Sequence, residues 1–210
     1  MNPEKQMIRG LVDQSWIDEL KTRAEQKNFD EWNDIIQEAD YLKNFEKYFG
    51  NLDYFKGKNF LDVGAGFGGS LHKLVKKLGA NLHNVDISPE AIEFLKQQGE
   101  TGHVSSVHAL PIENNSLDGV ISTNLLNTSV AMDKEDFENI LKEIYRVLKD
   151  QGTFIQSHYG DTQMPLSSEE QLKIISDIGF KNLEIMENKR SSEIMHNNGY
   201  SGDLAFIAKK

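Results

Sequence analysis

The sequence predicts a three-layer α/β/α fold, in which helices cover both faces of a mostly parallel sheet. From residue 58 onward, short apolar segments with strand character alternate with segments of helical spacing. A glycine-rich turn, N-F-L-D-V-G-A-G-F-G-G-S-L at 59–71, joins the first of these strands to the first helix. Residues 1–57 instead have an aromatic-rich helical pattern. We therefore expect an N-terminal helical cap, or a lid over a substrate pocket, at 1–57 and an α/β domain at 58–210.

The expected strands are short and mostly apolar, as in sheets that are buried on both faces. Helix-length connections between strands imply right-handed crossovers and parallel pairing. The last two strands have no clear helix between them, so we expect that pair to be antiparallel. In chain order the strands are Phe60–Val63, Leu82–Ile87, Gly102–Val107, Leu117–Thr123, Thr153–Ser157, Asn182–Met186 and Leu204–Ala208.

Helices are predicted where apolar residues recur with helical spacing behind a capping residue. Ser88, with Pro89 at the first helical position, begins one helix, and Asp133 begins a longer one. Ser167 and a glutamate three residues later form the pattern of a capping box. The helix after the glycine turn has apolar residues at 71, 74, 75 and 78 and is expected to end at Gly79.

Composition and charge restrict the classes of function. The chain has 210 residues, a net charge of -10 and no cysteine. The acidic balance argues against a nucleic-acid partner, and the lack of cysteine excludes disulfides, thiolate metal sites and a cysteine nucleophile. Met1–Gln14 lacks the apolar core of a secretory signal, and no stretch approaches the length of a membrane span. We expect a cytoplasmic protein, either a monomer or a homodimer.

Chemistry is expected at the carboxyl ends of the parallel strands, where open α/β sheets bind their ligands. Gly64, Gly66 and Gly69 satisfy G-x-G-x-x-G after the first strand and let a ligand approach the main chain. Asp86 ends the second strand, twenty residues after Gly66. A carboxylate at this spacing can accept hydrogen bonds from both hydroxyls of a ribose.

Four segments occur in a characteristic order along the chain. They are D-V-G-A-G-F-G at 62–68, V-D-I-S at 85–88, A-L-P-I-E-N-N-S-L-D-G-V-I-S at 109–122 and L-K-E-I-Y-R-V-L-K-D-Q-G-T-F at 141–154. Together they resemble class I S-adenosylmethionine-dependent methyltransferases, and most closely the small-molecule group that includes the ubiquinone/menaquinone-type enzymes. The resemblance implies a Rossmann-like sheet of seven strands whose last strand is antiparallel. It also implies S-adenosylmethionine as the cofactor.

The resemblance assigns roles to residues around the glycine turn. Asp62 would organise the glycine loop and the methionine end of the cofactor. Gly64 and Gly66, with Ala65 between them, would let the backbone approach the cofactor. Asp86 would hold the ribose hydroxyls.

Further cofactor contacts would lie after the second, third and fourth strands. Ile87 would flank the adenine. Ser106 and Val107 stand where family members often have Asp-Ala, so Ser106 would replace, more weakly, the aspartate that reaches the adenine amino group. Asn124 would lie beside the methionine moiety and the transferred methyl group. A histidine is frequent in the family just after the fourth strand, where this chain has Asn127.

Methyl transfer from a sulfonium is an in-line displacement, in which the protein chiefly positions the reactants and excludes water. A general base is needed only if the acceptor arrives protonated, and His158 and Tyr159, just after the fifth strand, are the candidates. A structural histidine and a pocket-wall tyrosine are the alternative interpretations. His72 is interpreted as a surface residue. The expected acceptor is a small molecule with an oxygen or nitrogen nucleophile, and no metal ion is expected.

Two other functions are compatible with parts of the sequence. An NAD-dependent oxidoreductase also uses G-x-G-x-x-G and an acid about twenty residues later, but Asp62, Leu110-Pro111 and the closing antiparallel strand favour a methyltransferase. A non-catalytic partner or regulatory domain could bind S-adenosylmethionine without turnover. The presence of Gly64, Gly66 and Asp86 favours cofactor binding. Binding alone does not establish turnover, which needs an activity measurement.

Overall fold

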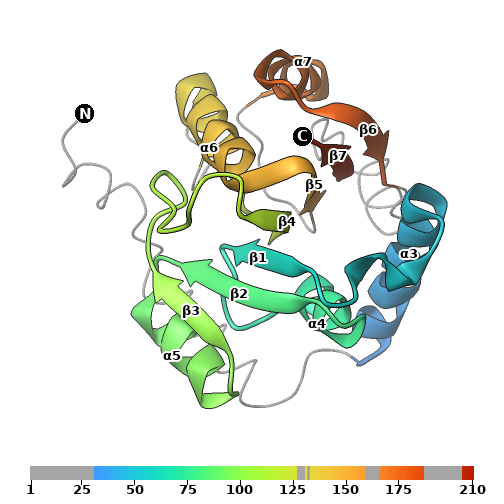
Figure 1. The fold of residues 1–210 in the computed structure, drawn as a ribbon, viewed down its shortest axis with the longest axis vertical. Helices are drawn as coiled ribbons and strands as arrows, with labels where there is room; N and C mark the ends of the chain where they lie inside the picture. Colours follow the sequence, from blue (N-terminus) through green and yellow to red (C-terminus); the bar gives the residue numbers. More distant parts are fainter. Residues whose placement is uncertain (1–30, 127–130, 132, 159–165, 187–204) are drawn as a thin grey trace.

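The computed structural model describes residues 31–126, 131, 133–158, 166–186 and 205–210. In this part of the chain, seven strands form one sheet in the order β3-β2-β1-β4-β5-β7-β6 (Figure 1). The first five strands pair in parallel, and β7 lies antiparallel between β5 and β6. The predicted seven-stranded, mostly parallel sheet with an antiparallel last strand is confirmed.

The strands and helices follow the predicted order. The strands are β1 (Asn59–Val63), β2 (Asn81–Asp86), β3 (Thr101–Val104), β4 (Leu117–Thr123), β5 (Leu148–Ser157), β6 (Lys181–Ile185) and β7 (Phe206–Lys209). The helices are α3 (Glu31–Phe49), the short 3-10 helix η1 (Leu52–Phe55), α4 (Ser70–Lys77), α5 (Pro89–Gln97), α6 (Lys134–Val147) and α7 (Ser168–Ile178).

Two strand bounds differ from the prediction by three residues or more. β3 ends at Val104, so the following residues of the predicted strand lie in a loop. β5 begins at Leu148 and includes the Asp-Gln-Gly segment that suggested a turn. Gln151 there has a left-handed φ of 65°, and the pairing of β5 with β4 shifts register between Leu117 and Gly119. The segment is therefore an irregularity within the strand.

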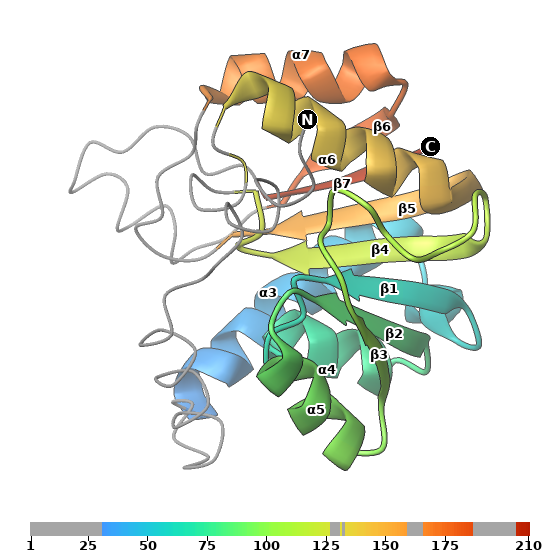
Figure 2. The same cartoon turned by 90° about the vertical axis from the view of Figure 1, so that its left-hand side faces the viewer.

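Helices cover both faces of the sheet. The crossovers from β1 to β2 and from β2 to β3 place α4 and α5 on one face, where α3 also lies (Figure 1). The crossovers from β4 to β5 and from β5 to β6 run the opposite way and place α6 and α7 on the other face. The direction reverses between β1 and β4, the position at which open α/β sheets bind ligands. The parallel strands all end at one edge of the sheet (Figure 2).

The predicted capping residues begin their helices. The side chains of Ser88, Asp133 and Ser167 each accept a hydrogen bond from a backbone N–H in the first turn. Glu170 completes the capping box at the start of α7. Gly179 ends the same helix with a left-handed φ of 116°. The local signals in the sequence thus correctly located three helix starts.

Helix α3 packs its aromatic residues on the sheet. Tyr41 and Phe45 are buried with Phe55 and Phe60, and the ring centroids of Phe45 and Phe55 lie 4.9 Å apart. The Tyr41 hydroxyl is hydrogen-bonded to Ser157 Oγ, 2.7 Å away at the carboxyl end of β5. Burial raises the pKa of Tyr41 far above its usual value, so the hydroxyl stays protonated. Helix α3 therefore reaches the edge of the sheet where ligands bind.

The first half of the expected N-terminal cap, residues 1–30, lies outside the described residues. The division of the chain at residue 57 therefore stays a prediction. Among the helices that the structure describes, none has both the length and the apolar character that a membrane span requires.

Replacing Tyr41 with phenylalanine tests the contact between α3 and β5. The change keeps the ring in the core but takes a hydrogen-bond partner from the buried Ser157 Oγ, so we expect the free energy of unfolding to fall by about 1–2 kcal/mol. Tyr48→Phe is the matched control, because the Tyr48 hydroxyl donates to a carbonyl at an exposed site. Its effect should stay below about 0.5 kcal/mol in urea denaturation. Equal losses in the two variants would contradict the special role of the buried contact.

Candidate cofactor and active site

The turn after β1 has the backbone geometry that its glycines predict. Gly64, Gly66 and Gly68 have positive φ angles of 69°, 52° and 80°, in the region that side chains disfavour. A Cβ atom on Gly64 would lie 2.8 Å from Leu125 Cδ1. Within the described part of the chain, no atom lies within 4 Å of a Cβ built on Gly66. The turn is therefore tightly packed at Gly64 and open at Gly66.

Asp86 lies at the end of β2, beside this turn. Its Oδ2 accepts a hydrogen bond from the Gly66 amide at 2.8 Å, and its Oδ1 accepts one from the Ser88 amide at 2.8 Å. Burial raises the pKa of Asp86, whereas these backbone donors favour the ionised form. Carboxylate oxygens can each accept more than one hydrogen bond, so the fixed carboxylate suits the hydroxyl donors of a ribose.

The turn forms hydrogen bonds with β2, and Asp62 forms one with α4. The amides of Gly64 and Ala65 donate to the carbonyl of Val85 at 2.8 and 3.2 Å, which fastens the turn to β2. The Asp62 side chain faces α4, where its Oδ2 lies 2.8 Å from Nδ1 of His72. His72 is only 4% exposed, so its interpretation as a surface residue is wrong. Its burial depends on the tertiary pairing with Asp62, which the helical pattern alone does not reveal.

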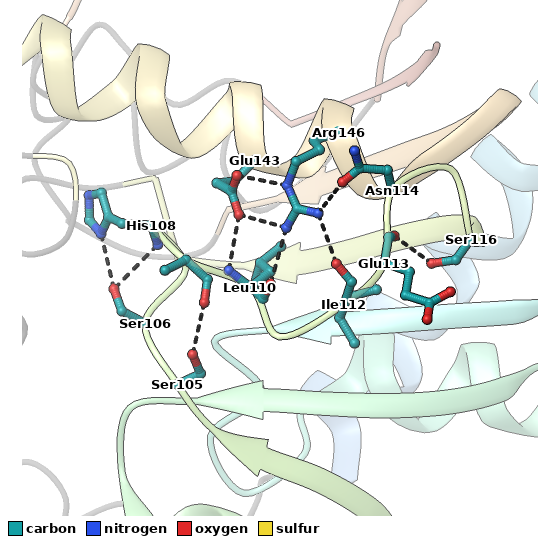
Figure 3. A network of polar contacts seen from close by, with 11 residues as sticks. Ser105, Ser106, His108, Leu110, Ile112, Glu113, Asn114, Ser116, Glu143 and Arg146 are labelled. Carbon is teal, nitrogen blue, oxygen red and sulfur yellow. Dashed lines mark hydrogen bonds and ion pairs between the residues drawn. The ribbon is translucent and has the colours of Figure 1, made fainter.

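The residues expected around the adenine follow β2 and β3. Ile87 comes directly after Asp86 and is half-buried. The Ser106 hydroxyl accepts a hydrogen bond from the His108 amide at 3.3 Å and lies 3.1 Å from His108 Nδ1 (Figure 3). It is therefore engaged within its own loop. Val107 is 6% exposed and packs in the core on the α6 side of the sheet. Their contacts with the cofactor stay predictions.

Arg146 of α6 holds the loop between β3 and β4 (Figure 3). Its guanidinium donates to the carbonyls of Leu110 and Ile112 at 3.0 and 2.8 Å and to Asn114 Oδ1 at 2.6 Å. It also pairs with Glu143, which accepts a hydrogen bond from the Leu110 amide at 3.0 Å. The hydrogen bond from Arg146 lowers the pKa of Glu143. Sequence reasoning assigned Arg146 no role, although it lies in one of the four recognised segments.

The residues expected near the transferred methyl lie at the ends of β4 and β5. Asn124 has a left-handed φ of 55°, and its amide donates to the Ser157 carbonyl at 3.0 Å. His158 is 1% exposed at the end of β5. Tyr159 lies outside the described residues. Among the residues that the structure describes, no group of three or more His, Asp or Glu side chains could hold a metal ion.

Comparisons with known proteins identify the fold and the cofactor. Residues 61–156 match the family described as a methyltransferase domain. Residues 61–156 of this chain are therefore a methyltransferase domain, with the sheet order of class I. Domains of this class use S-adenosylmethionine as their cofactor. The open side of the turn at Gly66, next to the fixed Asp86 carboxylate, fits the adenosine part of this molecule. The narrower ubiquinone/menaquinone-type grouping stays a prediction.

Relatives of this methyltransferase domain share the fold at modest identity. The sterol 24-C-methyltransferase erg6 of Aspergillus fumigatus is 33% identical over 107 residues, which are 47% of this chain and 27% of that protein. The match thus spans about a quarter of the length of that relative. A methyltransferase structure from Methanococcus maripaludis has a TM-score of 0.61 at 18% identity and covers 92% of this chain and 93% of its own. One from Listeria monocytogenes has a TM-score of 0.59 at 18% identity, with coverages of 79% and 97%.

Replacing Arg146 with alanine tests how the loop between β3 and β4 is held. The change removes charge-assisted hydrogen bonds to three loop residues, so we expect the free energy of unfolding to fall by about 2–3 kcal/mol at pH 7. Lys142→Ala is the matched control on the same helix, because Lys142 is exposed and pairs with Glu138 at the surface. That pair contributes below about 0.5 kcal/mol.

The same comparison has a pH dependence. The folded pKa of Glu143 lies below its unfolded value, so its stabilising effect is present above the unfolded pKa and is lost as the pH falls through the folded pKa. The difference in the free energy of unfolding between wild type and the Arg146→Ala variant should therefore become smaller in that acidic range. This account would be contradicted if the difference in the free energy of unfolding stayed constant with pH. It would also be contradicted if Lys142→Ala lost as much stability as Arg146→Ala.

Proposed function

We propose that the protein transfers the methyl group of S-adenosylmethionine to an oxygen or nitrogen nucleophile of a small-molecule acceptor. The main observation in support of this proposal is the Asp86 carboxylate, which two backbone amides hold beside the open side of the glycine turn. An NAD-dependent enzyme uses a similarly placed acid, but the match of residues 61–156 to a methyltransferase family favours the methyl donor.

When bound, S-adenosylmethionine supplies an electrophilic methyl group on its sulfonium. The contribution of the chain is to bind, orient and exclude water. Asp86 would accept hydrogen bonds from the ribose, and Asp62 and the turn would hold the methionine end. Asn124 and His158 directly follow β4 and β5, on the side of the switch point where the acceptor would approach. The acceptor nucleophile must lie in line with the bond that breaks, so the walls of the acceptor pocket determine which substrate reacts.

His158 is the base in this proposal when the acceptor arrives protonated. Its imidazole lies at the carboxyl end of β5, directly after Ser157, whose hydroxyl is paired with Tyr41. A histidine is suited to take a proton from an oxygen or nitrogen acceptor near neutral pH. Tyr159, the next residue along the chain, is the second candidate.

The acceptor class is supported by composition and by one relative. A net charge of -10 disfavours a polyanionic acceptor such as a nucleic acid. The matching relative from Aspergillus fumigatus is named for methylating a sterol, which supports a small-molecule acceptor. Its name specifies a carbon atom, so the choice between carbon and an oxygen or nitrogen nucleophile is part of the test. A cytoplasmic location belongs to the same proposal, in keeping with a chain that has no cysteine.

Substitution of Asp86 tests the cofactor site. Asp86→Ala removes the acceptor of the ribose hydroxyls, so we expect S-adenosylhomocysteine to bind at least about tenfold more weakly, as for a lost charge-assisted hydrogen bond. Glu93→Ala, an exposed acid on α5, is the matched control and should leave the affinity unchanged. Isothermal titration calorimetry measures the affinity of wild type and of both variants for S-adenosylhomocysteine and for NAD. Unchanged affinity in Asp86→Ala would refute the ribose role, and tight binding of NAD alone would overturn the proposed cofactor.

Substitution of His158 tests the chemical step. Removing a general base costs about 10²-fold or more in rate, so His158→Ala and His158→Asn should slow turnover by that factor. Their affinity for S-adenosylhomocysteine should stay within about twofold of wild type, because no bond to the cofactor is removed. Turnover is measured on a panel of oxygen, nitrogen and carbon acceptors. Equal loss of rate and affinity would exclude a base, and cofactor binding without turnover on any acceptor would favour a regulatory domain.

A further inference from the structure

A chain of four ionisable side chains runs beneath the glycine turn. The buried imidazole of His72 lies between two carboxylates. Its Nδ1 is 2.8 Å from Asp62 Oδ2, and its Nε2 is 3.0 Å from Glu100 Oε2. Glu100 also pairs with Lys76 at 2.6 Å and accepts a hydrogen bond from Asn84 at 3.0 Å. These groups come from β1, β2, α4 and the segment before β3, so the network, with the neutral Asn84, joins two strands to α4 and to the start of a third strand.

Two carboxylates on one imidazole favour a protonated ring, because a neutral ring has only one N–H to donate. Burial lowers the pKa of His72, but the hydrogen bonds and charges of Asp62 and Glu100 outweigh burial and raise it overall. Burial also raises the pKa of Glu100, but Lys76 and His72 outweigh that effect and lower it. Along the order Asp62, His72, Glu100 and Lys76, acidic and basic side chains alternate, so each lies beside a partner of the opposite type.

The His72 ring also supports the turn from below. A Cβ atom on Gly68 would lie 3.2 Å from His72 Cδ2, so the ring occupies the space beside Gly68 in the turn. Burial is the main cause of the raised pKa of Asp86 at the end of β2 and of Tyr41 on α3, and the nearby Asp62 carboxylate adds to the rise of both. A shift of the His72 ring would therefore change the position of the Asp62 carboxylate and the packing of the turn together.

We propose that His72 is a positioning residue that fixes the Asp62 carboxylate beneath the turn and, through it, the methionine end of S-adenosylmethionine. The inference rests on the function proposed above. A purely structural ion pair would stabilise the fold as a whole and would affect every ligand of the turn alike. A positioning role acts on one end of the ligand, because Asp86 continues to hold the adenosine end when His72 is replaced.

Two ligands separate these roles in calorimetry. S-adenosylhomocysteine carries the amino-acid end, whereas 5′-methylthioadenosine shares the adenosine and the thioether but lacks that end. We expect His72→Gln to weaken the binding of S-adenosylhomocysteine by about tenfold, a change of the size that one hydrogen bond to a charged group produces. The affinity for 5′-methylthioadenosine should change by less than about twofold. Lys76→Gln is the matched control, because it removes the outer charge and keeps both contacts of His72.

The outcomes decide between the two accounts. Equal weakening of both ligands by His72→Gln, or unchanged affinity for both, would overturn the positioning role. Failure of the wild-type protein to bind S-adenosylhomocysteine would instead overturn the proposed function. If His72→Gln does not fold, Asp62→Asn gives the second test, because it keeps an acceptor for His72 but removes the charge. The same split between the ligands is expected there, and its absence would overturn the proposal.

Nuclear magnetic resonance of the ring nitrogens provides a readout on the free protein. We expect the His72 ring to carry both protons at pH 7, because a carboxylate faces each nitrogen. A neutral ring at this pH would overturn the charged bridge on which the inference depends.

Discussion

The hydrogen bond from the Gly66 amide to the Asp86 carboxylate joins the ends of two neighbouring parallel strands. The amides of Gly64 and Ala65 strengthen this connection, since both donate to the carbonyl of Val85. Because β1 and β2 each have a strand paired on both sides, the sheet holds both ends of this connection in place. The candidate site is therefore built mainly from backbone groups and one carboxylate whose positions are set before any ligand arrives. Such preorganisation reduces the entropic cost of binding.

The two sides of the site are held from different layers of the fold. On the α4 side, His72 connects Asp62 with Glu100 beneath the turn. On the α6 side, Arg146 holds the loop between β3 and β4 and pairs with Glu143. The Arg146 pair contains no predicted cofactor contact, whereas the His72 pair contains Asp62. Each ion pair fixes a segment of backbone that could otherwise adopt several conformations.

Local patterns in the sequence predicted the features that depend on near neighbours. The capping side chains of Ser88 and Asp133 and the left-handed end at Gly179 are set within one helical turn, so residue type alone indicated them. The sheet followed from the alternation of strands and helices. Asp86 was expected at the end of the second strand, twenty residues after Gly66, and β2 does end at Asp86.

The features that the sequence did not predict depend on distant partners. His72 is buried because Asp62 and Glu100, ten and 28 residues away, supply its hydrogen bonds. Arg146 reaches loop carbonyls 34 and 36 residues away. The composition of Asp-Gln-Gly indicates a turn, yet β5 continues through this segment, where Gln151 and Gly152 share backbone hydrogen bonds with Lys210. In each case the tertiary pairing overrides a local preference.

The contact between Tyr41 and Ser157 joins residues 116 positions apart. Closing so long a loop is slow, and the entropy lost in closing it must be offset by contacts that form afterwards. The other end of α3 differs, because Phe45 meets Phe55 only ten residues later in the chain. A newly made chain can therefore pack this end of α3 at an early stage, whereas the Tyr41 end must await the fifth strand. The edge of the sheet that binds ligands is consequently among the last parts of the molecule to be completed during folding.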